Sequence, residues 1–302
     1  MKPIPVILDT DIGMDADDVW ALALLLRCPE LDLRLVVSAC GDTDYVAACA
    51  AHVLTVANRL DVPVGVGLPL DTTARTHADW LGDFQLGDYG GPVVRDGVGA
   101  LIDTIMASAE PVTVISIGPL PNLAAALQRE PRIAERARFV GMQGSVRRGY
   151  LGAPKPHREY NVRLYPQAAQ RVFAAPWDKT ITPLDSCGNF VLAGEDWHAL
   201  RASQDPLARI VAGAQDAFTA SLGERLFDGL DPREQTTPLY DTVAVYLAFA
   251  TEWLTMETLG IQVTDDGRTL IDADAPRVHC ATGWRDERAF KALLLACLTG
   301  NS

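Results

Sequence analysis

Five carboxylates are crowded into ten residues near the start of the chain: Asp9, Asp11, Asp15, Asp17 and Asp18. The apolar run at residues 4–8 before them is typical of a short buried strand, and the run at 19–26 after them is typical of a buried helix. The acidic segment therefore lies where a first strand passes to a first helix. Ligands of open α/β sheets bind beyond such strand ends. Carboxylates this close repel one another, and a divalent cation with oxygen ligands neutralises them best.

Strand and helix patterns alternate along the chain. Apolar runs that predict strands occur at residues 4–8, 33–37, 62–66, 112–117, 138–142 and 180–185, and a β segment is predicted at 259–271. Helices are predicted at 19–26, 46–57, 94–109, 123–129, from Pro166, and at 206–222, 239–251 and 287–298. The alternation predicts an α/β fold with an open, largely parallel, Rossmann-like sheet and helices on both faces. Because no repeat or linker interrupts it, we expect one domain over residues 1–302.

Charge and composition limit the class of partner. A net charge of −13 without a basic stripe argues against nucleic acid, because affinity for phosphate backbones comes from clustered Lys and Arg. No apolar run approaches the roughly 18 residues of a membrane span, and the N-terminal apolar stretch is too short for a signal peptide. The six scattered cysteines favour buried free thiols over disulfides or a zinc site. We therefore expect a cytoplasmic protein that binds neither nucleic acid nor membrane.

Helix capping alone does not account for the acidic segment. Asp17 and Asp18 lie at the predicted helix start, where the helix dipole favours carboxylates, but capping explains one or two acids and not five. The segment is not a calcium-binding hand, because positions six and twelve of that loop need glycine and glutamate, where this chain has Met14 and Trp20. The pattern therefore predicts metal binding or catalysis at this segment.

The segment resembles the N-terminal signature of the nucleoside hydrolases, the inosine-uridine-preferring ribohydrolase family. That signature is Asp-x-Asp-x-Gly and then an Asp-Asp pair at a helix start; here two extra residues within 14–16 separate Gly13 from the pair. Four further segments resemble family motifs in the same order: Gly41-Asp42, Gly118-Pro119-Leu120-Pro121-Asn122-Leu123-Ala124, Met142-Gln143-Gly144 with Glu159-Tyr160-Asn161, and Pro238-Leu239-Tyr240-Asp241. Together the five motifs imply the nucleoside hydrolase fold and the activity of an N-glycosyl hydrolase.

The resemblance implies a tightly held calcium ion. Its ligands would be Asp11, Asp18, Asp241 and the main-chain carbonyl of Ile117. Calcium takes roughly six to eight oxygen ligands, which this set begins to supply. Ile117 ends a predicted buried strand, so its carbonyl can point into the crevice. Without the family pattern, Asp241 is more readily interpreted as a helix cap.

The same resemblance implies contacts with the substrate. It places Asp17, Glu159 and Asn161 around the ribose, whose vicinal hydroxyls suit carboxylates and amides, although a Glu-x-Asn triple is by default part of a polar loop. Met142, in a matched motif, is also expected at the substrate.

Two substrate positions depart from the family pattern. Asp42 replaces an asparagine and adds a carboxylate beside the metal, and Tyr150 replaces an asparagine that contacts the sugar. These departures concern the choice of nucleoside more than the binding of metal or ribose. The substrate is therefore expected to be a ribonucleoside or a non-standard ribosyl compound.

The implied reaction is hydrolysis of the N-glycosidic bond of a ribonucleoside, giving ribose and free base with inversion. Positive charge develops on the sugar, and carboxylates stabilise it. Calcium lowers the pKa of a bound water and orients it. Asp11 is the expected general base, because the family's equivalent carboxylate touches both metal and nucleophile.

Tyr240 stands where purine- and uridine-cleaving members of the family have a histidine, the proposed acid for the departing base. An ordinary tyrosine pKa near 10 makes it a poorer acid at neutral pH. Activation of the leaving group is then expected from Tyr240 with a shifted pKa, from another group, or from stacking. His77, Trp80 and Tyr89 of the irregular segment 69–91 are candidates, although each taken singly is more readily a surface histidine or a core aromatic residue.

Two other functions are kept as alternatives. The missing histidine fits a ribose- and calcium-binding homologue that has lost turnover. Phosphatases of the haloacid-dehalogenase type also have Asp-x-Asp after a first strand, but Ile12-Gly13 does not fit their next residues, and only Lys155 and Lys179 are candidates for holding phosphate. For the assembly, the family resemblance suggests a homodimer or homotetramer.

Overall fold

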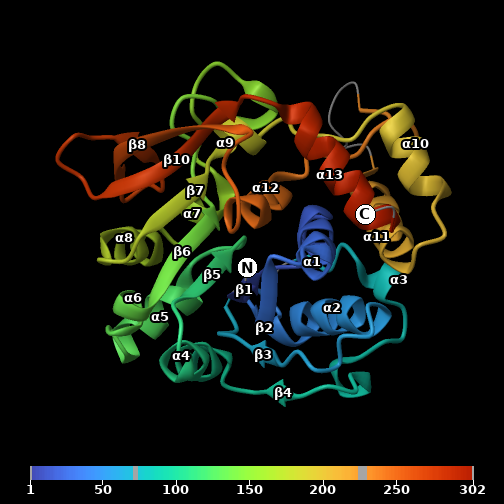
Figure 1. The fold of residues 1–302 in the computed structure, drawn as a ribbon, viewed down its shortest axis with the longest axis horizontal. Coiled ribbons are helices and arrows are strands. Elements are labelled where there is room, and N and C mark those ends of the chain that lie inside the picture. Colours follow the sequence, from blue (N-terminus) through green and yellow to red (C-terminus); the bar gives the residue numbers. More distant parts are fainter. Residues whose placement is uncertain (1, 71–73, 224–229, 301–302) are drawn as a thin grey trace.

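A ten-stranded sheet in the order β4-β3-β2-β1-β5-β6-β7-β10-β8-β9 runs through the computed structural model, which describes residues 2–70, 74–223 and 230–300 (Figure 1). The strands are β1 Ile4–Thr10, β2 Leu31–Ser38, β3 Val64–Val66, β4 Val93–Val94, β5 Val112–Ser116, β6 Ala137–Met142, β7 Lys179–Thr182, β8 Leu254–Val263, β9 Thr269–Ile271 and β10 Arg277–Trp284. Neighbouring strands are parallel from β4 to β10, whereas β8 is antiparallel to both β10 and β9.

Helices cover both faces of this sheet. They are α1 Asp17–Arg27, α2 Thr43–Val56, α3 Ala78–Leu81, α4 Gly97–Ala107, α5 Pro121–Arg129, α6 Ile133–Arg136, α7 Tyr160–Leu164, α8 Pro166–Ala174, α9 Leu184–Cys187, α10 Glu195–Ala202, α11 Pro206–Leu222, α12 Tyr240–Leu247 and α13 Glu287–Thr299, with 3-10 turns η1 Leu86–Asp88 and η2 Tyr150–Gly152. Side chains alternate along β1: Val6 and Leu8 are buried with α1, α2, α12 and α13, whereas Ile7 is buried with α4, α5 and α8. The predicted α/β fold with a largely parallel sheet is therefore confirmed.

The chain reverses its direction of travel across the sheet at β1. It first adds β2, β3 and β4 on one side of β1, and then returns to add β5, β6 and β7 on the other side. Open α/β sheets bind ligands at such a switch point, outside the carboxyl ends of the strands. The Ile117 N–H donates to the Asp9 carbonyl at 2.9 Å, so the chain leaving β5 lies directly beside the acidic segment.

Several predicted elements have different bounds in the structure, and for two of them the physical reason is local. The helix predicted at 94–109 begins only at Gly97, because Asp96 caps it by accepting a hydrogen bond from the Gly99 N–H at 3.0 Å. The strand predicted at 180–185 ends at Thr182, since Pro183 turns the chain into α9. The irregular segment 69–91 contains α3 and η1 in its described part.

Strand β10 and helix α10 lie where the sequence pattern predicts neither. In β10, buried Val278 and Cys280 alternate with exposed Arg277 and His279 over only four residues, a period-2 signal too short to stand out.

The strands of the described residues lie between Ile4 and Trp284. That residues 1–302 form one domain stays a prediction. The described cysteines are all buried, and none of them forms a disulfide. Among the described residues, no helix combines the length and apolarity that crossing a bilayer requires.

Candidate active site

A cavity of about 360 Å³ opens at the switch point, beyond the carboxyl ends of β1, β5 and β6. Six carboxyl groups, three tyrosines and two methionines contribute most of its lining, which consists of Asp11, Met14, Asp15, Asp17, Asp18, Ile117, Met142, Tyr150, Glu159, Tyr160, Asn161, Tyr240 and Asp241. No lysine, arginine or histidine is among these lining residues. A concave site with a few converging polar groups is the usual form of a small-molecule site.

Asp9 supports the cavity from behind and does not line it. Its carboxylate is fully buried and accepts hydrogen bonds from Ser116 Oγ at 3.0 Å and from Asn122 Nδ2 at 2.8 Å. Asn122 Nδ2 also donates to the Ser38 carbonyl at 3.0 Å, so this network ties β1 to β5, α5 and β2. Burial raises the pKa of Asp9 to about 7, although these two hydrogen bonds lower it in part.

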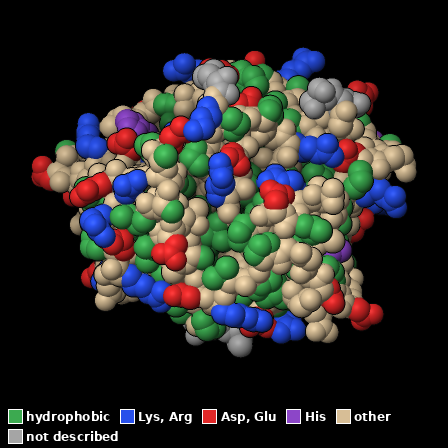
Figure 2. All heavy atoms as spheres, turned by 60° about the horizontal axis from the view of Figure 1, so that its bottom comes forward, with side chains coloured by type: hydrophobic (Ala, Val, Ile, Leu, Met, Phe, Trp, Pro, Cys, Tyr) green, Lys and Arg blue, Asp and Glu red, His purple; other side chains and the backbone are tan. Residues whose placement is uncertain are grey.

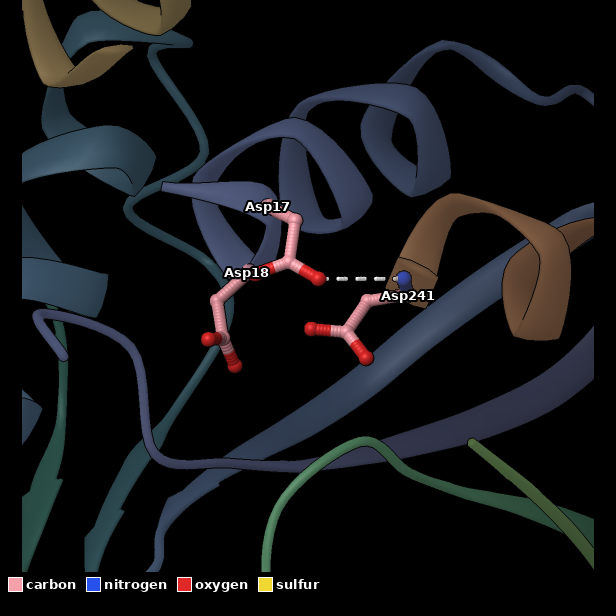
Figure 3. A group of neighbouring side chains, drawn as sticks. All are labelled: Asp17, Asp18 and Asp241. Carbon is pink, nitrogen blue, oxygen red and sulfur yellow. Dashed lines mark hydrogen bonds between the residues drawn. The ribbon is translucent and has the colours of Figure 1, made fainter. Parts of the chain in front are cut away.

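Asp17, Asp18 and Asp241 form a compact group of carboxylates. The first two lie in the first turn of α1 and the third in the first turn of α12, so both helix dipoles favour negative charge here. Figure 3 shows the three side chains gathered between the two helix ends, where the Asp241 N–H donates to Asp17 Oδ2 at 3.3 Å. Each residue offers an oxygen within 4.8 Å of the oxygens of the other two.

The electrostatics of this group favour a cation. Burial raises the pKa values of all three carboxyls, and the charges of neighbouring carboxylates raise them further, that of Asp17 to about 8. Thr10 Oγ1 donates to Asp18 Oδ1 at 2.5 Å and fixes that side chain. A positive charge among these oxygens would favour their ionised forms and reverse the shifts. The group could therefore bind a metal ion, and its oxygen donors suit a hard divalent cation.

Asp11 reaches the same cavity from the end of β1. Its carboxylate lies against Gly118, where a Cβ would come within 2.7 Å of Asp11 Oδ1, so only glycine leaves room for it. Burial, and then the charge of Asp17, raise the pKa of Asp11. The charge of Asp11 in turn raises the pKa values of Asp18 and Asp241, which places it beside the compact group.

Ile117 and Asn161 connect the end of β5 to this site. The Ile117 carbonyl accepts a hydrogen bond from Asn161 Nδ2 at 2.9 Å, and the Met142 carbonyl accepts another at 3.0 Å. Both amide hydrogens of Asn161 are thereby used, and its Oδ1 is left to accept a hydrogen bond from a ligand. The four predicted calcium ligands, Asp11, Asp18, Ile117 and Asp241, all line one cavity.

Glu159 caps α7 while it lines the cavity. Its Oε1 accepts from the Asn161 N–H at 2.6 Å, and its Oε2 accepts from the N–H groups of Gly144 at 2.8 Å and Val162 at 3.2 Å. Burial raises its pKa to about 7 against the effect of these donors. Three backbone donors fix the carboxylate, which has further lone pairs for a ligand.

Tyrosine rings form another part of the wall. Tyr150 and Tyr240 meet edge to face with their centroids 6.0 Å apart, and the Tyr150 hydroxyl accepts a hydrogen bond from the Tyr160 N–H at 2.9 Å. Burial, followed by the charges of Asp15 and Asp17, raises the pKa of Tyr240 well above its ordinary value. This direction is opposite to the shift that an acid working at neutral pH needs.

A family model of inosine-uridine preferring nucleoside hydrolases matches residues 6–292. The chain belongs to this family. It is 33% identical over 203 residues to the non-specific ribonucleoside hydrolase RihC of Klebsiella pneumoniae, and the match covers 64% of this chain and 65% of RihC, just under two thirds of that relative. It is 31% identical over 229 residues to the pyrimidine-specific ribonucleoside hydrolase RihA of Escherichia coli O139:H28, 71% of each chain.

Solved nucleoside hydrolase structures share the fold. A plant nucleoside hydrolase, PpNRh1, superimposes with a TM-score of 0.82 at 24% identity, covering 98% of this chain and 99% of that one. A purine-preferring ribonucleoside hydrolase from Gardnerella vaginalis gives 0.82 at 21% identity, with 98% of each chain covered. The family predicted from the motifs is confirmed.

Asp42, His77 and Trp80 are predicted substrate residues that this nucleoside hydrolase does not bring to the cavity. Asp42 caps α2 by accepting from the Tyr45 N–H at 3.2 Å and forms an ion pair with Arg75. Burial acts to raise the pKa of Asp42, but the Arg75 and Tyr45 hydrogen bonds outweigh it and lower that pKa. Asp42 therefore serves the start of α2 and is not beside the carboxylate group.

The described part of segment 69–91 packs against α2 and α11 instead of covering the cavity. The His77 ring is fully buried and stacks on Phe218 with centroids 6.1 Å apart, and burial lowers its pKa to about 4. Trp80 Nε1 donates to the Ile210 carbonyl at 3.1 Å, and the Tyr89 hydroxyl donates to the Val62 carbonyl at 2.6 Å. His77 and Tyr89 are buried and Trp80 is half-buried against the core, and none of the three rings lines the cavity as predicted.

Thr76 fixes the backbone of the acidic segment, a role that the sequence does not indicate. Its Oγ1 lies 2.9 Å from the carbonyls of Gly13 and Met14 and 2.9 Å from His77 Nδ1. The hydroxyl has one hydrogen, and both carbonyls lie close enough to accept it. The Tyr45 hydroxyl also donates to the Gly13 carbonyl, at 3.2 Å. Gly13 has a φ of 104°, which glycine tolerates best.

Three further lining residues, Met14, Asp15 and Tyr160, carry no predicted role. Asp15 lies in the acidic segment and Tyr160 lies between two predicted ribose residues, so their positions in the sequence were the available signal. On the face shown in Figure 2, Lys and Arg side chains are interspersed with Asp and Glu side chains. Ion pairs between partly exposed side chains include Arg147–Glu257 and Arg201–Asp216. The expected lack of a nucleic-acid partner stays a prediction.

Proposed function

We propose that this protein hydrolyses the N-glycosidic bond of a ribonucleoside to give ribose and free base, with calcium at the carboxylate group and Asp11 as general base. One observation carries the proposal: oxygen donors from β1, α1, β5 and α12 converge on a single cavity at the switch point. The relatives named as ribonucleoside hydrolases support the same reaction.

The donor set fits a calcium ion. Asp11, Asp18, Asp241 and the Ile117 carbonyl would hold it, and all four are oxygen ligands in a buried site. Asp17 lies close enough to serve as a fourth carboxylate ligand or to bind the ribose. Such a site prefers calcium over softer metals, because neither histidine nor cysteine is among the residues that line it. When bound, calcium supplies a water of lowered pKa and an oriented position for it.

The side chains of this protein would carry the remaining steps. Asp11 takes the proton of the attacking water, whose oxygen bonds to the anomeric carbon as the bond to the base nitrogen breaks. The surrounding carboxylates stabilise the positive charge that develops on the sugar. Glu159 and the Oδ1 of Asn161 accept hydrogen bonds from ribose hydroxyls, and the Asp17 carboxylate accepts one from another ribose hydroxyl. Attack from the face opposite the base gives inversion.

The aromatic wall would hold the base. Tyr240 stays protonated, so it contributes a ring face and a hydrogen-bond donor instead of a strong acid. Because no histidine lines the cavity, substrates whose aglycone leaves without a proton are cleaved most readily. We also expect a homodimer or homotetramer located in the cytoplasm, which light scattering and cell fractionation would check.

A ribose-release assay tests the proposal. The substrates are inosine, adenosine, guanosine, uridine, cytidine and p-nitrophenyl riboside, each assayed with added calcium and with a chelator. We expect calcium-dependent ribose release from at least the nitrophenyl compound, whose leaving group needs little acid assistance. Ribose and calcium binding without cleavage of any riboside would instead support a homologue that has lost turnover, the alternative favoured by Tyr240.

A further inference from the structure

One carboxylate of the cavity has no part in the proposed mechanism. Asp11, Asp18 and Asp241 hold the metal, and Asp17 and Glu159 hold the ribose, which leaves Asp15. Asp15 belongs to the stretch where this chain has two residues more than the family signature, just before α1. The Ala16 N–H donates to its Oδ1 at 2.6 Å and fixes the side chain. A fixed carboxylate in the cavity calls for a positive or hydrogen-bond-donating group on the ligand.

Asp15 lies beside the aromatic wall. Asp15 lines the same cavity as the rings of Tyr150 and Tyr240. Tyr240 meets Tyr150 edge to face, and both rings line the cavity. Ring faces attract cations through their quadrupole, and a nearby carboxylate adds direct attraction. Arg163 lies over the Tyr160 ring at 5.7 Å but does not line the cavity, and no other lysine, arginine or histidine of the described residues lines it.

The chemistry of the leaving group also favours a positively charged ligand. A neutral purine or pyrimidine departs as an anion unless an acid protonates it, and no histidine lines this cavity. A heteroaromatic ring whose glycosidic nitrogen is already positively charged departs as a neutral molecule and needs no acid. A site whose described lining has no histidine and offers rings with a carboxylate is therefore matched to that kind of aglycone.

We infer that the preferred substrate is a riboside of a positively charged nitrogen heteroaromatic ring, an N-ribosylpyridinium, with its ring against Tyr150 and Tyr240 and its charge facing Asp15. The inference rests on the proposed function of the same site. In the reaction the water oxygen bonds to the anomeric carbon, and the carbon–nitrogen bond breaks with both electrons going to the ring nitrogen. The products are ribose, a neutral pyridine, and one proton that passes from water to Asp11 and then to solvent.

Steady-state kinetics of the calcium-loaded protein test the inference. The substrates are the N-riboside of nicotinamide, p-nitrophenyl riboside, inosine and uridine. We expect kcat/KM for the pyridinium riboside to exceed the values for inosine and uridine by about tenfold or more, in the range that a paired and stacked cation supports. Asp15→Asn should lower kcat/KM for the pyridinium riboside about fivefold more than for p-nitrophenyl riboside, mainly through KM. The matched control is Asp83→Asn, a change at an exposed position outside the cavity, which should leave both values unchanged.

The outcomes separate this inference from the proposed function. Cleavage of p-nitrophenyl riboside together with a preference for inosine or uridine overturns the inference and leaves the hydrolase proposal standing. Loss of inosine turnover in Asp15→Asn, with the pyridinium riboside unaffected, also overturns it, because Asp15 would then act as a leaving-group acid. No cleavage of any riboside overturns both.

A second readout needs no variant. The N-methylnicotinamide cation should inhibit the wild-type protein about tenfold more strongly than neutral nicotinamide, as a cation bound against aromatic rings requires. Equal inhibition by the two compounds contradicts the inference even if Asp15→Asn does not fold.

Discussion

The cavity has two halves that the fold builds differently. The metal half (Asp11, Asp18, Ile117 and Asp241) lies at the ends of β1 and β5 and at the first turns of α1 and α12, elements that pack together in the core. The aglycone half (Asp15, Tyr150, Tyr160 and Tyr240) is drawn largely from connections, namely the stretch before α1, the turn η2 and the start of α7. The hydrolytic centre is therefore anchored in the sheet, while the side that meets the base can change with its loops.

The largest expected effect comes from the metal half. Asp241→Asn removes one charged donor from the first turn of α12 and should lower ribose release about a thousandfold, since metal assistance is worth several kcal/mol. Calorimetry should show weaker calcium binding in the same variant. Asp83→Asn is the matched control in an exposed segment and should behave as wild type. Normal calcium affinity and activity in Asp241→Asn would remove this residue from the metal half.

Calcium should also change how stability depends on pH. The pKa values of Asp9, Asp17 and Glu159 are raised to about 7, 8 and 7, so without metal the folded protein holds more protons than the unfolded chain between about pH 4 and pH 8. The stability that these groups contribute is therefore fully present below about pH 4 and is lost as the pH rises towards 8. Calcium binds the ionised forms and should raise Tm by more at pH 8 than at pH 6. Thermal unfolding at both values checks this; an equal rise at both would contradict the raised pKa values.

Thr76 connects the two halves, because it fixes the carbonyls of Gly13 and Met14 between Asp11 and Asp15. Thr76→Val keeps the shape and removes the hydroxyl, and we expect kcat/KM to fall about tenfold as the acidic segment loosens. Unfolding in denaturant should show a loss of about 1–3 kcal/mol for the unsatisfied carbonyl. Thr104→Val, which removes a bond to the Ala100 carbonyl within α4, is the control. A similar loss of activity in both variants would mean that Thr76 acts only through global stability.

The smallest effect is expected from the Tyr240 hydroxyl. Tyr240→Phe keeps the ring against Tyr150 and should lower kcat/KM for p-nitrophenyl riboside less than about threefold, because one hydrogen bond to a neutral group contributes little. Tyr240→Leu removes the ring face and should lower the same kcat/KM by more than Tyr240→Phe does. If Tyr240→Phe instead lowers inosine turnover a hundredfold with little effect on p-nitrophenyl riboside, the hydroxyl is the leaving-group acid.

The two halves also differ in how far the sequence predicts them. The acidic segment can be recognised from the local sequence alone. The strand before it and the helix after it place Asp11, Asp17 and Asp18 at one sheet edge, and no distant contact has to be known. Asp241 and Ile117 required the family motifs, since nothing local shows that α12 and β5 meet α1 and β1.

The predicted site residues that do not line the cavity are side chains whose position depends on tertiary packing. His77 and Trp80 are in a segment without clear periodicity, and their burial against α2 and α11 decides where they point. Asp42 was matched by motif position, but Arg75 and the start of α2 bind its carboxylate. Tyr160 was overlooked between Glu159 and Asn161, because alternating loop residues give no signal of which side faces a cavity.

The most direct test of the central claim is ribose release from p-nitrophenyl riboside by calcium-depleted protein, before and after calcium is added back, in the wild type and in Asp11→Asn. We predict that calcium restores activity to the wild type, that a chelator removes it again, and that Asp11→Asn stays about a thousandfold less active while its circular dichroism is unchanged. Full activity without calcium, or in Asp11→Asn, would contradict a calcium-dependent hydrolase with Asp11 as its base.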